Sequence, residues 1–369
     1  MNKILVVFGT RPELIKLYPI IISKNLRNKI TVCNTGQHKE MIDGLLKIFK
    51  IKPSINLNVM KNKQPLTFLF NKIFYNLNNV ILRSRPKIIL VHGDTISAAA
   101  ASLVGFYNKI KVFHIEAGLR TYNNQSPYPE EFNRQIISRA TTVHFAPTKI
   151  NRDILKTEKA NGKILVCGNT VLDALKLTLK NNSKKIKKDI IKKFDINLKK
   201  KFILITIHRR EILGKNLELF LSNIKKLTKN FPEINFFYVL HKNPIARKPV
   251  IKFLKNINNI KLIDHLDYDE FSFLLYKCYF VLTDSGGLQE EGPFLRKPVI
   301  VVRSETERIE ALKLGTIKLV GYNFKLLNNI FYKLVRDKKF YKKMISFKNP
   351  YGDGNSTRII EKEIINNII

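Results

Sequence analysis

Short apolar runs rich in Val, Ile and Leu alternate along the chain with longer segments of helical periodicity. Buried parallel strands are near-continuous apolar runs, and each needs a crossover helix before the next strand. The alternation therefore predicts an α/β fold built on parallel sheets. The predicted strands form two series: Ile4–Phe8, Ile30–Asn34, Ile88–His92, Val112–Glu116, Val143–Ala146 and Ile164–Val166, then Phe202–Thr206, Asn235–Val239, Ile260–Ile263, Phe280–Thr283, Val299–Val302 and Ile317–Leu319.

A chain of 369 residues is too long for one ordinary core and suits two domains. We expect two doubly wound, Rossmann-like domains that face each other, with the active site in the cleft between them. The predicted boundaries are residues 1–170 and 171–350. The chain breaks at Asn349–Gly354, and we expect the last segment, residues 351–369, to supply a C-terminal helix that packs back on the first domain.

The formal net charge is +37, from 66 Lys and Arg against 29 Asp and Glu. Such a charge is typical of proteins that bind nucleic acids or anionic membranes, but a composition biased toward Lys, Asn and Ile produces it too. The lysines are spread along the chain, and no nucleic-acid-binding motif accompanies them. We favour the compositional explanation and expect no specific nucleic-acid or membrane partner.

No apolar run approaches the roughly 20 residues needed to cross a bilayer. The opening run Lys3–Phe8 is too short for a signal peptide and leads into a turn with charges, so we predict a strand there and a cytoplasmic protein. The cysteines, Cys33, Cys167 and Cys278, lack metal-ligand spacing. Cys33 and Cys278 lie in or beside apolar stretches, so we expect buried free thiols there.

Polar residues gather where the apolar strands end, which is the edge where open α/β sheets bind ligands. After the first strand, Thr10 and Glu13 have capping-box spacing and predict the start of a helix. Arg11 and Lys16 are then cations beside free backbone N–H groups, a favourable anion site. An ordinary helix cap explains Thr10 and Glu13 but gives no reason for Gly9.

Acidic residues follow the next strands. Asp94 follows one strand, Glu116 ends another, and Glu130 lies at the start of a later helix. Asp94 could alternatively cap the helix after it, and Glu130 suits the dipole of its own helix. Together the three carboxylates lie at neighbouring strand ends, where burial produces the shifted pKa values that acid–base catalysis requires.

In the second series, His208 follows a strand and is flanked by arginines, which favours a phosphate-facing role. Gly286 and Gly287, after Ser285, let backbone N–H groups approach a diphosphate closely. Glu291, one turn into the next helix, can bind ribose hydroxyls. Neither the G-x-G-x-x-G nor the P-loop fingerprint is present, so the ligand is not obviously NAD or ATP.

Taken together, these segments resemble the non-hydrolysing UDP-N-acetylglucosamine (UDP-GlcNAc) 2-epimerases of bacteria over almost the whole chain. The motifs that carry the resemblance are Phe8–Glu13, His92–Thr95, Glu116–Arg120, Gly168–Thr170, His208–Glu211 and Asp284–Glu291. The resemblance implies the two-domain architecture of GT-B glycosyltransferases, a homodimer, and no nicotinamide or metal cofactor. It also implies reversible conversion of UDP-GlcNAc to UDP-N-acetylmannosamine (UDP-ManNAc). UDP would be eliminated to give 2-acetamidoglucal and then added back, supplying sugars for surface polysaccharides.

The resemblance also assigns roles to residues. The catalytic residues would be Asp94, Glu116, Glu130 and His208. The three acids are the acid–base candidates, and the resemblance does not assign any of them to a particular face of the sugar. Substrate binding would fall to Arg11, Lys16, Ser285, Gly286 and Gly287 at the diphosphate, Glu291 at the ribose, Phe271 at the uracil, and Arg308 at the sugar or phosphate side. A second, allosteric UDP-GlcNAc site would use Gln37, His38, Lys72, Arg210 and His241. Lys72 stands where arginine is expected and loses its bidentate fork.

Related enzymes remain as alternatives. A GT-B glycosyltransferase would share the fold and the UDP site, and an epimerase of a UDP-diacetamido uronic acid sugar would share nearly everything. A hydrolysing epimerase would release free ManNAc. The three acids argue against a transferase, while Arg11–Glu13 and Pro129–Glu131 favour the non-hydrolysing branch.

Overall fold

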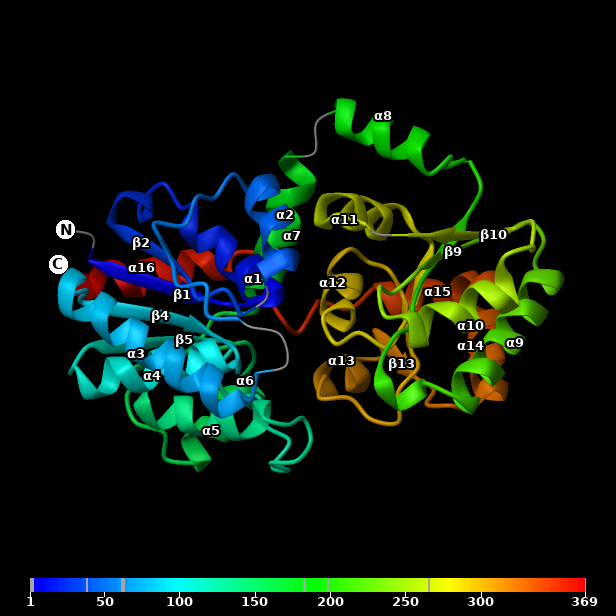
Figure 1. Cartoon of the computed structure of the whole chain (residues 1–369). Helices are drawn as coiled ribbons and strands as arrows, with labels where there is room; N and C mark the ends of the chain where they lie inside the picture. Colours follow the sequence, from blue (N-terminus) through cyan, green and yellow to red (C-terminus); the bar gives the residue numbers. More distant parts are fainter. Residues whose placement is uncertain are drawn as a thin grey trace. The chain divides into compact units, whose positions relative to one another are not determined.

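The computed structural model describes residues 3–37, 39–60, 64–181, 184–197, 199–264 and 266–368. The chain divides into two compact units, each built on one parallel sheet (Figure 1). Unit 1 comprises residues 1–177 and 351–369, and unit 2 comprises residues 178–350. The predicted α/β class with two doubly wound domains is confirmed.

The sheet of unit 1 has the strand order β3-β2-β1-β4-β5-β6-β7. Its strands are β1 (Ile4–Phe8), β2 (Ile30–Asn34), β3 (Ile55–Asn56), β4 (Ile88–His92), β5 (Lys111–Ile115), β6 (Val143–Ala146) and β7 (Lys163–Val166). Its helices are α1 (Arg11–Ile21), η1 (Arg27–Lys29), α2 (Lys39–Phe49), α3 (Leu66–Ser84), α4 (Ile96–Tyr107), α5 (Glu130–Ala140), α6 (Lys149–Thr157), α7 (Thr170–Asn181), which begins here, and α16 (Ser356–Ile368). The strand order reverses between β1 and β4, which makes this pair the topological switch point.

The sheet of unit 2 has the order β10-β9-β8-β11-β12-β13, with its switch point between β8 and β11. Its strands are β8 (Phe202–Thr206), β9 (Asn235–Val239), β10 (Ile260–Ile263), β11 (Phe280–Thr283), β12 (Val299–Val301) and β13 (Ile317–Leu319). Its helices are α8 (Lys184–Lys193), η2 (Arg210–Ile212), α9 (Lys215–Asn230), α10 (Pro244–Leu254), α11 (Tyr268–Lys277), α12 (Leu288–Phe294), α13 (Ile309–Leu314), α14 (Phe324–Arg336) and α15 (Lys338–Ile345).

All the predicted strands are present, and most have the predicted bounds. The strand expected to reach Glu116 ends one residue earlier, because Glu116 adopts a left-handed backbone with φ of 65°. Strand β3 is not predicted from the sequence, since its two residues, Ile55 and Asn56, form no apolar run.

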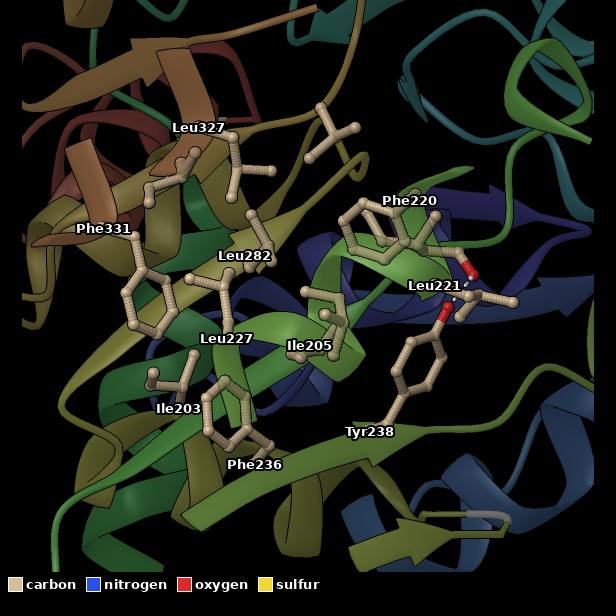
Figure 2. Packing of buried hydrophobic residues seen from close by; sticks show 14 of the residues in the cluster. Ile203, Ile205, Phe220, Leu221, Leu227, Phe236, Tyr238, Leu282, Leu327 and Phe331 are labelled. Carbon is tan, nitrogen blue, oxygen red and sulfur yellow. Dashed lines mark hydrogen bonds between the residues drawn. The ribbon is translucent and has the colours of Figure 1, made fainter. Parts of the chain in front are cut away.

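The core of unit 2 shows how buried packing fixes the strand ends. Figure 2 shows Ile205 of the sheet in one cluster with Leu327 and Phe331 of α14. Within this cluster the hydroxyl of Tyr238 donates a hydrogen bond to the Ile207 carbonyl, at 3.4 Å. Ile207 comes directly after β8, so the core reaches the loop where polar residues begin.

Helix α16 is tied into unit 1 at both of its ends. At its start, Asp173 of α7 accepts hydrogen bonds from the backbone N–H groups of Ser356 (3.2 Å) and Thr357 (2.9 Å). At its end, the Ile368 carbonyl accepts from the Lys3 ammonium at 2.7 Å. Residues more than 300 positions apart in the chain therefore stabilise the same compact unit.

Cys33 and Cys278 are buried free thiols, as predicted, and Cys167 is a buried free thiol as well. In the part of the chain that the structure describes, no helix is both long and apolar enough to cross a membrane.

Candidate active site

The loop after β1 and the loop after β4 are joined by Glu13 of α1. Its Oε2 accepts hydrogen bonds from the backbone N–H groups of Gly9 (2.9 Å) and Thr10 (2.8 Å), and its Oε1 accepts from the Thr95 hydroxyl at 2.7 Å. The capping box predicted for Thr10 and Glu13 is present. Burial raises the pKa of Glu13, although these hydrogen bonds oppose the shift. Spacing along the sequence reveals the local cap but not the bond across to Thr95.

Gly9 has a packing role that the sequence interpretation missed. A Cβ added there would lie 2.2 Å from both Ser97 Oγ and Thr35 Oγ1, and 2.9 Å from Gln37 Cβ. These three side chains are connected by hydrogen bonds. Thr35 and Ser97 share one of 2.8 Å, and Ser97 Oγ donates another to Gln37 Oε1 at 2.9 Å. Glycine is therefore required at this position by unit 1 itself.

Glu116 lies at the carboxyl end of β5 and is mostly buried. It forms an ion pair with the Lys16 ammonium, and it accepts a hydrogen bond from Asn169 Nδ2 at 2.8 Å. His92 Nε2 lies 3.6 Å from the same carboxylate. A non-glycine residue at positive φ is strained, and such strain is concentrated at functional sites. Two predicted site residues, Lys16 and Glu116, are thus in direct contact. His92 and Asn169, which also contact Glu116, belong to the segments His92–Thr95 and Gly168–Thr170.

Asp94 lies after β4 and is held by Arg134 of α5. Both Nε and Nη2 of Arg134 lie 2.8 Å from Asp94 Oδ2. The alternative role of Asp94 as a helix cap is wrong, because Thr95 is the N-cap of α4 and accepts from the Ala98 N–H. The carboxylate is therefore available for a role outside helix capping.

Glu130 and Glu131 begin α5 and differ in their surroundings. Glu131 is fully buried and accepts hydrogen bonds from the backbone N–H groups of Thr121 (2.9 Å) and Tyr122 (3.3 Å). Burial alone would raise its pKa, but these hydrogen bonds and Arg134 hold the pKa below its ordinary value. Glu130 instead has a buried Oε2 with no hydrogen-bond partner among the described residues. Oε2 of Glu130 can therefore accept a hydrogen bond or a proton, whereas the Glu131 carboxylate holds the backbone at Thr121 and Tyr122.

In unit 2, His208 follows β8 and Asp284 follows β11, on either side of the switch point. Asp284 Oδ2 accepts from the backbone N–H groups of His208 and Arg209, each at 2.7 Å. The imidazole of His208 stacks on that of His241, with ring centroids 4.8 Å apart and planes 1° from parallel. Burial, with the neighbouring His208, lowers the pKa of His241. A predicted catalytic residue and a predicted allosteric residue are therefore in contact.

The segment Ser285–Gly287 leads from β11 into α12. An added Cβ at Gly286 would lie 3.5 Å from the Arg308 guanidinium, and one at Gly287 would lie 3.8 Å from Glu291 Oε2. Both distances are ordinary van der Waals contacts, so packing does not explain these glycines. The Arg308 guanidinium is itself held by Glu290, with Nε and Nη2 each 2.9 Å from Oε1.

The remaining predicted residues have fewer contacts. Phe271 is partly buried on α11, and Arg11 is partly buried at the first position of α1. Lys72 Nζ donates to the Val59 carbonyl at 3.4 Å. His38 and the side chain of Arg210 lie outside the described residues. The allosteric assignment of these positions stays a prediction.

Comparisons with known proteins agree on one family. A family model described as UDP-N-acetylglucosamine 2-epimerase matches residues 22–365. The UDP-N-acetylglucosamine 2-epimerase of Campylobacter jejuni is 46% identical and covers 100% of this chain and 98% of its own length.

Solved structures give the same result. The UDP-GlcNAc 2-epimerase from Neisseria meningitidis, bound to UDP-GlcNAc, has a TM-score of 0.91 at 44% identity and covers 98% of this chain and 99% of its own. The enzyme from Methanocaldococcus jannaschii, in complex with UDP-GlcNAc and UDP, has a TM-score of 0.82 at 30% identity, with coverage of 98% and 99%.

The packing around Gly9 yields a prediction about stability. Because a methyl group would overlap Ser97 Oγ and Thr35 Oγ1, we expect Gly9→Ala to lower the free energy of unfolding by about 1–3 kcal/mol. The matched control is Gly44→Ala on α2, where an added Cβ meets no described atom within 4 Å. That change should raise the free energy of unfolding by about 0.5–1 kcal/mol. Urea unfolding followed by circular dichroism measures both, and equal stability of Gly9→Ala and wild type would contradict the packing.

Proposed function

The chain belongs to the UDP-N-acetylglucosamine 2-epimerase family, and we propose on that basis that it interconverts UDP-GlcNAc and UDP-ManNAc. The observation that carries the proposal is the set of carboxylates at the switch-point edge of unit 1. Glu116 is held in a strained backbone conformation and paired with Lys16, and Asp94 is paired with Arg134. Acids placed in this way suit proton transfer at a carbon atom.

We propose that the reaction eliminates UDP from the substrate. A carboxylate removes the proton at C2 while the bond between C1 and the diphosphate oxygen breaks, which leaves 2-acetamidoglucal and UDP. The reverse addition, with the proton delivered to the opposite face of C2, gives the epimer. Glu130 supports this route, because its buried Oε2 has a lone pair free to accept a proton. The epimer would supply ManNAc-derived sugars for surface polysaccharides.

We assign the uridine diphosphate to unit 2. Gly286 and Gly287 carry no side chain, so phosphate oxygens can approach their backbone N–H groups closely, whereas the Ser285 N–H is donated to the Thr283 hydroxyl at 2.9 Å. Cations and donors aimed at the departing diphosphate stabilise the charge that develops on it. His208 and Arg308 are the candidates for that role in unit 2. Arg11 and Lys16 supply cations in unit 1, Glu291 is proposed for the ribose, and Phe271 for the uracil.

We also propose that the chain forms a homodimer through α3 and α4. These helices expose large apolar side chains, and three of them, Phe68, Tyr75 and Leu82, recur every seven residues on one face of α3. Asn108 after α4 donates to Asn78 of α3 at 3.0 Å, so the two helices form one continuous surface.

Charge favours a second copy of this chain on that surface. Helices α3 and α4 contain two charged residues, Lys72 and Arg83, whereas charged residues make up 26% of the chain. Two molecules that each carry a net charge of +37 repel one another over most of their surface. A face almost free of charge is where they can approach, and its apolar side chains would then be buried.

The epimerase proposal is tested by hydrogen exchange at C2. The purified protein is incubated with UDP-GlcNAc in D₂O and followed by proton NMR. We expect UDP-ManNAc with deuterium at C2, since the proton is removed and replaced from solvent. Unchanged substrate would contradict the proposal and favour a transferase or an epimerase of another UDP-sugar. Free ManNAc with UDP would instead identify a hydrolysing enzyme.

The acid–base assignment predicts the effect of neutralising each carboxylate. Asp94→Asn, Glu116→Gln and Glu130→Gln should each lower turnover by at least about 10²-fold, the scale of lost general acid–base catalysis. The control is Asp153→Asn in unit 1, since Asp153 is 59% exposed and pairs with its neighbour Arg152. It should retain wild-type turnover. Near-normal turnover in all three site variants would contradict the assignment and show that other residues transfer the proton.

The dimer proposal predicts the effect of a single charge. Tyr75 is 69% exposed in the middle of α3, so Tyr75→Lys places like charges against each other in a dimer. Light scattering should show wild type at about twice the chain mass of 42.9 kDa and the variant at a single chain mass. The control is Leu219→Lys on α9, where the apolar side chain is 47% exposed, and this variant should remain dimeric. A monomeric wild type, or a dimeric Tyr75→Lys variant, would overturn the interface.

A further inference from the structure

Asp284 is a buried carboxylate at the switch point of unit 2, with 1% of its surface exposed. Its Oδ2 accepts the backbone N–H groups of His208 and Arg209, each at 2.7 Å. It therefore ties the loop after β8 to the end of β11. Charge-assisted hydrogen bonds of this length are among the stronger ones in proteins.

The other oxygen of Asp284 points to the imidazole of His208. Oδ1 lies 3.5 Å from His208 Nδ1, and it has no hydrogen-bond partner among the described residues. One oxygen is enough to hold the two N–H groups of the loop. A buried oxygen left unpaired destabilises the fold, so a purely structural role leaves Oδ1 unexplained. A small movement of the ring closes the gap to Nδ1, as catalytic hydrogen bonds often tighten when substrate binds.

The ring of His208 is held on one face as well. It stacks on His241, with centroids 4.8 Å apart, yet its side chain remains 38% exposed and accessible to a ligand. The peptide before it is also fixed, because the hydroxyl of buried Tyr238 donates to the Ile207 carbonyl (Figure 2). Tyr238 of β9, His241 after β9 and Asp284 after β11 thus restrict the backbone and the ring of His208.

We infer that Asp284 is the positioning residue of His208, holding its backbone through Oδ2 and its Nδ1–H through Oδ1, so that Nε2 faces the diphosphate of the substrate. This inference rests on the proposed function of His208 as a diphosphate-facing residue. A carboxylate at Nδ1 fixes the tautomer of an imidazole and stabilises its positive charge. In the protonated ring both nitrogens carry a proton, so Nε2–H can donate to the diphosphate oxygen that gains charge as the bond to C1 breaks.

Four ionisable groups among the described residues act electrostatically on His208 or Asp284. They are His241 after β9, Tyr238 of β9, Arg209 of the same loop, and Tyr322 after β13. Of these, Arg209 is a cation and cannot accept a proton from Nδ1–H. The two tyrosines have pKa values raised mainly by burial, so they stay neutral at ordinary pH. Asp284 is therefore the anion that acts on Nδ1.

The first experiment reads the tautomer of His208 directly and needs no activity. Protein labelled with ¹⁵N in its seven histidines is recorded by long-range ¹H–¹⁵N NMR at about pH 9, where an ordinary imidazole is neutral. A His208→Gln variant identifies the signal. We expect wild-type His208 to carry its proton on Nδ1. In Asp284→Asn the amide N–H₂ faces Nδ1, and the proton should move to Nε2. A wild-type proton on Nε2, or an unchanged tautomer in Asp284→Asn, would overturn the inference.

The second experiment measures the consequence for the reaction. We expect Asp284→Asn, which keeps an oxygen for the two N–H groups, to lower kcat about 10²-fold with a smaller change in KM, because misplacement of a catalytic group mainly slows the chemical step. Asp337→Asn is the matched control, since Asp337 also accepts two backbone N–H groups, from Lys339 (2.8 Å) and Phe340 (3.0 Å), but pairs with no histidine in the described part of the chain. It should keep wild-type kinetics.

The outcomes separate this inference from the proposed function. If Asp284→Asn keeps kcat within about two-fold of wild type, below the loss expected for a misplaced group, the positioning role is overturned while the epimerase activity stands. If wild type does not epimerise UDP-GlcNAc, the proposed function fails, and the tautomer measurement still decides whether Asp284 orients His208.

Discussion

In both units a buried carboxylate connects the first strand to the fourth. At a topological switch point the loops after these two strands turn away from each other, so backbone N–H groups that follow the first strand have no neighbouring strand to pair with. In unit 1 Glu13 accepts the two N–H groups after β1 and also the Thr95 hydroxyl after β4. In unit 2 Asp284, after β11, accepts the two N–H groups after β8. Leaving such a group buried and unpaired costs on the order of 1–3 kcal/mol. By accepting these N–H groups, the two carboxylates stabilise the loops at the sheet edge where the candidate site lies.

The sequence predicts the features that depend on local residue patterns, but not those that depend on contacts between distant segments. Strand positions depend on local apolar runs, and these agree with the structure almost residue by residue, apart from the two-residue β3. The strand ends then locate Asp94, Glu116 and His208 correctly at the two switch-point edges. The partners of those residues depend on contacts between segments far apart in the chain. Glu13 and Thr95 are separated by 82 positions, and His208 and Asp284 by 76, so no local pattern shows either pair. The sequence alone also provides no reason for Gly9. The reason is packing against Ser97 and Thr35, which are distant in the sequence.

The strong positive charge of the chain does not extend to the buried residues near the candidate site. The chain contains 29 acidic residues against 66 basic ones, yet many of the buried acids lie next to the two switch points. Glu290 is an example, since it is buried and holds the Arg308 guanidinium beside Gly286. Exposed positions tolerate a drift of composition toward lysine, because surface substitutions change stability little. Buried acids do not, since each holds donors or cations that would be left unpaired without it. A composition that favours lysine therefore does not account for the buried acids at the sheet edges, which makes them a functional signal despite the overall charge.

The acids at these edges fall into two kinds that differ in what holds them. Glu13 and Asp284 are almost fully buried and bind neutral backbone or hydroxyl donors, which a ligand cannot remove without breaking the loops. Asp94 and Glu116 are more exposed and pair with the cationic side chains of Arg134 and Lys16, and Glu116 also accepts a hydrogen bond from Asn169. An anionic ligand competes for a cation but not for a backbone N–H group that is already buried. The first kind therefore keeps the geometry of the edge constant, and the second kind can change partners during a reaction. Proton transfer at a carbon atom needs both properties at one place: a fixed frame, and carboxylates whose charge is balanced by groups that respond to the substrate.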